Sequence, residues 1–107
     1  MILVLGGDAL QAGAQTPAGE ELQHLAPASL EDVLSAARER GARRVVAPFP
    51  AAGLNLFALA RELRRAGGPP LVLVGALRRD QRFWAERNGG AVVERLEAAL
   101  GDEVPVP

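Results

Sequence analysis

Short, continuous apolar runs that are separated by amphipathic segments constrain the fold of this chain more than any other feature. The runs lie at Ile2–Leu5, Arg44–Pro48, Leu71–Gly75 and Ala91–Val93. Runs of this length, apolar at consecutive positions, are typical of strands in a parallel sheet that is covered on both faces. We therefore predict a strand at each of these four places.

The segments between these runs carry apolar residues at the spacing of one helical face. Helix start signals stand at Ser29 and Asp80, and glycine or asparagine follows each of the four segments. We predict four helices: one from a Ser29 cap to Gly41, Asn55–Arg64, one from an Asp80 cap to Arg87, and one from Leu96 to Gly101.

Strands that alternate with helices predict an α/β domain with a parallel sheet of four to five strands and helices on both faces. The fifth strand depends on the residues before the first helix. Thr16 before Pro17 is compatible with a short helix through Leu25, whereas Leu22–Ala26 fits an edge strand, which we favour. We assign residues 1–103 to one domain and 104–107 to an extended tail.

The residue types that are missing exclude most familiar catalysis. The chain has no cysteine, lysine or tyrosine, and His24 is its only histidine. Disulfides, thiolate catalysis, cysteine-based metal sites, Schiff bases and the lysine of a phosphate-binding loop are therefore excluded. A lone imidazole without a second ligand at helical spacing is expected to be a surface or edge-strand residue. We predict no catalytic residue, no metal and no cofactor.

The charge distribution argues against a nucleic-acid or membrane partner. The net charge is −1, and the arginines are interleaved with acids, so no field of one sign extends over the surface. The apolar runs are also far shorter than the ~20 residues of a membrane helix. We expect a cytoplasmic protein. The use of arginine without lysine fits either a thermophilic source or GC-rich coding.

In a parallel α/β sheet, ligands bind beside the carboxyl ends of the strands. The residues at these ends are Gly6, Gly7, Asp8, Pro48, Phe49, Gly75 and Ala76. Asp8 is a candidate ligand at this edge of the sheet, although an aspartate that follows two glycines is also common in turns. The glycine pair lacks the Gly-x-Gly-x-x-Gly spacing of a dinucleotide site.

The stretch Ala28–Ala76 resembles the middle of a response-regulator receiver domain. The resemblance includes the Ala-Ser-Leu-Glu-Asp-Val-Leu helix start, the strand Arg44–Pro48, the helix Asn55–Arg64 and the sequence Pro-Pro-Leu-Val-Leu-Val-Gly-Ala. The opening strand Ile2–Leu5 fits the first receiver strand as well. The resemblance implies a three-layer, flavodoxin-like fold.

Receiver domains accept a phosphoryl group on an aspartate at the end of the third strand, and acids after the first strand hold magnesium. The resemblance places Pro48 at the phosphoacceptor position and Gly6 and Gly7 at the acidic pair, with Asp8 beside them. Gly75 stands where a hydroxyl residue is usual, and Glu97 is the nearest counterpart of the usual lysine. The resemblance therefore implies a pseudo-receiver that is not phosphorylated.

Such a domain is expected to act through contacts with another protein or with itself. Phe83 and Trp84 are adjacent on a helix and point about 100° apart, so they cannot both face the same core equally. Either one ring is exposed, or both rings are half-buried over the edge of the sheet. The candidate interaction surface consists of Phe49, Leu54, Arg82, Trp84 and Arg87. The alternative function is a flavodoxin-like or nucleotide-binding type of domain that binds a small anionic ligand at the strand ends.

Overall fold

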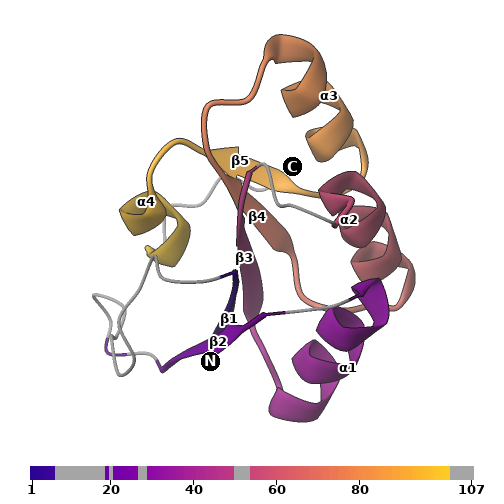
Figure 1. The fold of residues 1–107 in the computed structure, drawn as a ribbon, viewed down its shortest axis with the longest axis vertical. Helices are drawn as coiled ribbons and strands as arrows, with labels where there is room; N and C mark the ends of the chain where they lie inside the picture. Colours follow the sequence, from indigo (N-terminus) through magenta and orange to yellow (C-terminus); the bar gives the residue numbers. More distant parts are fainter. Residues whose placement is uncertain (7–18, 20, 27–28, 50–53, 102–107) are drawn as a thin grey trace.

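From Leu22 onward, strands and helices alternate along the chain as the sequence predicts. The computed structural model describes residues 1–6, 19, 21–26, 29–49 and 54–101. In this part the order is β1 (Ile2–Leu5), β2 (Leu22–Leu25), α1 (Leu30–Arg40), β3 (Arg44–Pro48), α2 (Leu56–Arg65), β4 (Leu71–Val74), α3 (Arg79–Arg87), β5 (Ala91–Val93) and α4 (Leu96–Leu100). Figure 1 shows the strands in the middle of the domain and the helices packed beside them.

The described strands form one parallel, five-stranded sheet in the order β2-β1-β3-β4-β5. β2 pairs with β1 at the edge, where Val4 lies opposite His24. The predicted edge strand at Leu22–Ala26 is thus confirmed, and the alternative helix through Leu25 is wrong. The backbone of Leu22–Leu25 is extended because it hydrogen-bonds to β1, and Gly6 N–H also donates to Leu25 O at 2.9 Å. Residues 7–18 and the proposed tail at 104–107 lie outside the described residues.

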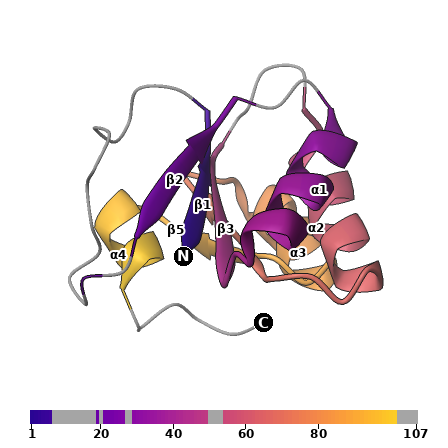
Figure 2. The ribbon, with the colours of Figure 1, turned by 90° about the horizontal axis from the view of Figure 1, so that it is seen from below.

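Helices lie on both faces of the sheet, as Figure 2 shows: α1, α2 and α3 on one face and α4 on the other. Alternate residues of each strand point to opposite faces. Leu3 and Val45 therefore pack in the core under α1, α2 and α3. Ile2 and Val46 pack in the second core, which includes Ala99 of α4. All five side chains are fully buried.

Local signals fix the ends of the first two helices. Ser29 caps α1 by accepting from Asp32 N–H at 3.3 Å, and Gly41 ends it in the left-handed conformation at φ 64°. Asn55 caps α2, because its side-chain oxygen accepts from the N–H groups of Phe57 and Ala58, each at 3.1 Å. These contacts satisfy amide groups that have no partner within the helix.

The cap of α3 differs from the prediction. Arg78 is the N-cap residue, and its N–H donates to the Gln81 side chain at 2.9 Å. Asp80 lies within the first turn and forms an ion pair with Arg78 at 3.2 Å. The prediction of an Asp80 cap is wrong because the helix begins one residue before it.

Replacement of Asn55 tests the α2 cap. Asn55→Ala removes the acceptor for two amide groups, so we expect a loss of about 1 kcal/mol in the free energy of unfolding, measured by urea denaturation. Asn55→Asp keeps an oxygen acceptor at the same place and is expected to retain the stability of the original chain. An Asn55→Ala variant as stable as the original chain would show that the cap contributes nothing.

Arg44 connects β3 to α4 across the face of the sheet. It is the first residue of β3, it is 7% exposed, and one guanidinium nitrogen, Nη1, donates to Ala99 O at 2.7 Å and to Gly101 O at 2.9 Å. The last carbonyls of a helix have no partner within the helix. Arg44 supplies this partner for α4, which has only five residues and could not form a stable helix alone.

Among the described residues, no helix has the length and apolar content needed to cross a bilayer.

Candidate functional site

The carboxyl ends of three neighbouring strands bring together Gly6, Pro48 and Gly75, which follow or end β1, β3 and β4. Gly6 has a positive φ of 75°, and a Cβ atom added there would lie 3.5 Å from Cγ of Pro48. The proline ring thus lies beside the glycine backbone. Gly7 and Asp8 lie outside the described residues. Glu97 belongs to α4 by its backbone, and its side chain is outside the described part.

Pro48 is the last residue of a central strand, a place where a missing N–H usually breaks the ladder. Phe49 N–H donates to Val74 O of β4 at 2.9 Å. Peptide N–H groups alternate in direction along a strand, so the nitrogen of Pro48 points to the β1 side. The proline therefore leaves the hydrogen bond from Phe49 to β4 intact and removes the donor that would face β1.

Gly75 is enclosed by the backbone of the neighbouring strand end. Its φ is 154°, and an added Cβ atom would lie only 2.8 Å from the carbonyl oxygen of Phe49. Its N–H donates to Val93 O at 3.0 Å, which fixes the backbone from the β5 side. A residue with a side chain does not fit at this position without movement of the backbone.

Phe49 and Leu54 are half-buried and pack against the core under α1, α2 and α3. The ring of Phe49 contacts the ring of Phe57 on α2, with 5.9 Å between centroids and 56° between planes. Much of the apolar surface of these two predicted interaction residues is therefore used within the domain.

The ends of β1, β3 and β4 offer little for acid–base or nucleophilic chemistry. The side chains of Gly6, Pro48, Phe49 and Gly75 there are two hydrogens, a pyrrolidine ring and a phenyl ring. Within the described ranges no group of three or more His, Cys, Asp or Glu residues is arranged to hold a metal ion. His24 lies in β2 at the sheet edge, and its Nε2 is buried without a hydrogen-bond partner.

The other predicted interaction residues lie on α3, and both aromatic residues there are exposed. Phe83 is 54% and Trp84 is 53% exposed, and their rings form an edge-to-face pair with centroids 5.4 Å apart. Ala85 is the buried residue of this helix. Arg82 and Arg87 are exposed, and Arg82 forms an ion pair with Glu86 at 3.1 Å. The sequence alone did not predict that both rings face solvent.

A hollow of about 390 Å³ lies between α3 and α2. Its walls include Phe57 of α2, Gln81 and Trp84 of α3, and Asn88, which directly follows α3. The Asn88 side chain is held in place because its Nδ2 donates to Trp84 O at 2.8 Å. Sequence analysis missed this hollow, since Phe57 is distant in the chain and no sequence pattern relates it to Trp84.

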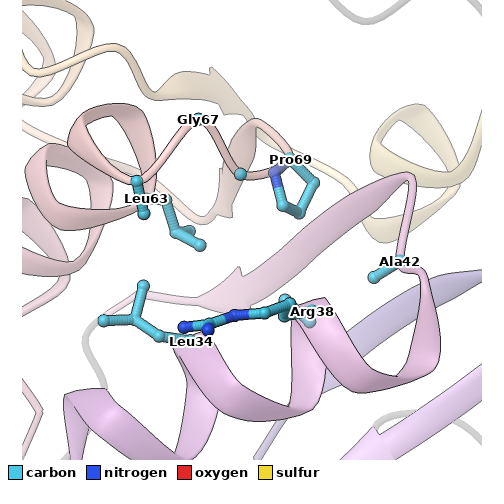
Figure 3. A pocket seen from close by; sticks show the side chains of 9 residues that line it. Leu34, Arg38, Ala42, Leu63, Gly67 and Pro69 are labelled. Atoms are coloured by element: carbon cyan, nitrogen blue, oxygen red, sulfur yellow. The ribbon is translucent and has the colours of Figure 1, made fainter.

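A second hollow, of about 330 Å³, lies where α1 and α2 end. Figure 3 shows Leu63 and Pro69 on one side of it and the Arg38 side chain extending along the other toward Leu34. Ala42 precedes β3 and Pro69 precedes β4, so this hollow opens at the amino ends of the strands, opposite the predicted site. Its lining is aliphatic apart from Arg38. This composition suits contact with apolar groups and provides no nucleophile.

Comparisons of this chain with protein-family models, curated proteins and solved structures found no match.

Proposed function

We propose that this protein is a pseudo-receiver: a domain with the three-layer, flavodoxin-like fold of receiver domains that does not accept a phosphoryl group and acts by binding protein. The strand order β2-β1-β3-β4-β5 supports this proposal, because it is the order of flavodoxin-like sheets, to which receivers belong. Helices on both faces of the sheet support it as well.

The observation that carries the proposal is which residues stand at the carboxyl ends of the strands. Where the resemblance to receivers places a phosphoacceptor carboxylate, the chain has Pro48, whose ring has no nucleophilic atom. Where it places a hydroxyl group, the chain has Gly75, and the carbonyl of Phe49 occupies the space that a side chain would need. Both changes remove reacting groups while the sheet that would position them is kept.

The exposed aromatic pair on α3 supports a role in protein binding. Large aromatic side chains are normally buried, and an exposed pair flanked by arginines has the composition of an interface centre. Phe83 and Trp84 lie on α3, and both are exposed. We therefore propose that this domain binds its protein partner through α3.

Incubation with acetyl phosphate and magnesium tests the first part of the proposal. We expect the intact mass of the protein to remain unchanged, because the strand end lacks the acceptor carboxylate. A phosphorylatable receiver domain in the same mixture serves as the positive control. A stable aspartyl phosphate on this chain would overturn the proposal.

Thermal unfolding with added flavins and nucleotides addresses the alternative function in the same preparation. A ligand that binds the native state raises its stability, by about 2.7 kcal/mol at a concentration one hundred times its dissociation constant. The pseudo-receiver proposal expects no such shift. An increase of several degrees with one ligand would instead favour a small-molecule site.

A further inference from the structure

One face of α3 carries the exposed aromatic pair, with a negative charge near the start of the helix and a positive charge near its end. Asp80, Phe83, Trp84 and Arg87 are spaced i, i+3, i+4 and i+7, which places them on one side of the helix. We call these four residues the α3 face. All four side chains are exposed. The acid lies in the first turn and the base in the last turn.

No described element covers the α3 face. Figure 1 shows α2 on one side of α3 and no described element on its outer side. The hollow of about 390 Å³ between Phe57 and Trp84 adjoins this face. For comparison, a protein cavity of about 150 Å³ holds a benzene molecule. An aromatic ring from a partner therefore finds room beside Trp84.

We propose that the α3 face binds the same face of a second copy of this chain, with the two helices antiparallel about a twofold axis. This inference rests on the proposed function and names the partner. When the axis passes between positions 83 and 84, Phe83 of each copy meets Trp84 of the other. The same register places Asp80 of each copy opposite Arg87 of the other. The face is thus complementary to itself in apolar content and charge.

The charges select this arrangement over the parallel one. In a parallel twofold pair each residue lies opposite its own copy, so Asp80 would face Asp80 and Arg87 would face Arg87. Like charges at this separation repel, whereas the antiparallel pair forms two attractive contacts. Asp80 already accepts from Arg78 at 3.2 Å and 3.3 Å. A carboxylate has about four acceptor sites, so it can contact Arg87 of the partner as well.

The size of the face predicts a weak dimer. A helix of nine residues is roughly 13 Å long, so the contact is smaller than a standard interface of about 800 Å² per partner. Interfaces of standard size span dissociation constants from about micromolar to picomolar. We expect this dimer to have a dissociation constant weaker than about 1 µM.

Sedimentation equilibrium between about 10 µM and about 1 mM protein measures the association directly. Trp84 is the only tryptophan of the chain, so its emission reports on this face alone. We expect the molar mass to rise toward that of a dimer, with a shift of Trp84 emission to shorter wavelength over the same concentration range. A chain that stays monomeric throughout would overturn the proposal.

Charge reversal tests the register. Asp80→Arg and Arg87→Asp each turn two attractive contacts into two repulsive ones, so each variant alone is expected to associate about tenfold more weakly. An equimolar mixture of the two variants restores two opposite-charge contacts and is expected to form a heterodimer as stable as the original dimer. Recovery in the mixture also shows that both variants are folded.

Glu39→Arg provides the matched control, because Glu39 is an exposed acid on α1 and the variant changes the net charge by the same amount. Association of this variant should equal that of the original chain. Unchanged dimerisation by Asp80→Arg, or a mixture that stays monomeric, would overturn the proposed register. A monomer that acetyl phosphate does not modify would overturn the dimer alone, whereas an aspartyl phosphate would overturn the pseudo-receiver function whatever the molar mass.

Discussion

Gly75→Ala is expected to lower the free energy of unfolding by about 2–4 kcal/mol, for two reasons that act together. The backbone at this position has φ 154°, which residues with a Cβ atom rarely adopt. The new Cβ atom would also lie 2.8 Å from Phe49 O, and a backbone oxygen cannot move aside as a flexible side chain can. Urea denaturation of both proteins measures the difference.

Gly67→Ala is the matched control for this prediction. Gly67 also has a positive φ, of 68°, but an added Cβ atom meets nothing within 4 Å. Its replacement is therefore expected to cost only the conformational strain, about 1 kcal/mol. If the two variants were equally stable, the carbonyl of Phe49 would not be held against position 75, and a side chain would fit there.

Arg44→Met is expected to have the second large effect, a loss of about 2–4 kcal/mol. Methionine replaces the apolar part of the side chain but donates no hydrogen bond. The carbonyl groups of Ala99 and Gly101 then lose the guanidinium nitrogen that holds them at 2.7 Å and 2.9 Å. A buried acceptor without a partner costs about 1–3 kcal/mol. Here the buried carbonyl of Ala99 and the partly buried carbonyl of Gly101 both lose theirs.

Hydrogen exchange locates this effect within the chain. Because α4 is short and depends on Arg44, we expect its amides to exchange faster in Arg44→Met even under conditions where the sheet stays folded. Arg95→Met is the control: Arg95 is an exposed arginine directly before α4, and its replacement should change stability by less than about 0.5 kcal/mol. Unchanged exchange in α4 of Arg44→Met would contradict the anchoring role.

Local signals in the sequence were sufficient to predict most helices and strands. Apolar runs such as Leu71–Val74 form strands because both faces of a parallel sheet are buried, and that requirement is visible in the residues themselves. The caps at Ser29 and Asn55 and the stop at Gly41 act within a few residues. The Asp80 cap was predicted wrongly because the helix begins at Arg79, with Arg78 as its N-cap residue, and the Gln81 side chain accepts from Arg78 N–H.

Contacts between distant residues were not predictable in this way. The strand order depends on how the crossovers pack, and Leu22–Leu25 becomes a strand because β1 provides its hydrogen bonds. Phe49 O lies against Gly75 because β3 and β4 are neighbours. The hollow beside Trp84 needs Phe57 of another helix.

The sequence by itself determined the residue types: a chain without cysteine or lysine, with two glycines and a proline at the strand ends, excludes thiolate and amine chemistry in any fold. Only the tertiary structure decided what surrounds these residues. It placed the carbonyl of Phe49 against Gly75 and left Phe83 and Trp84 exposed on the outer helix. The physical reason is that composition fixes which groups a chain possesses, whereas packing between distant segments fixes which of them reach solvent.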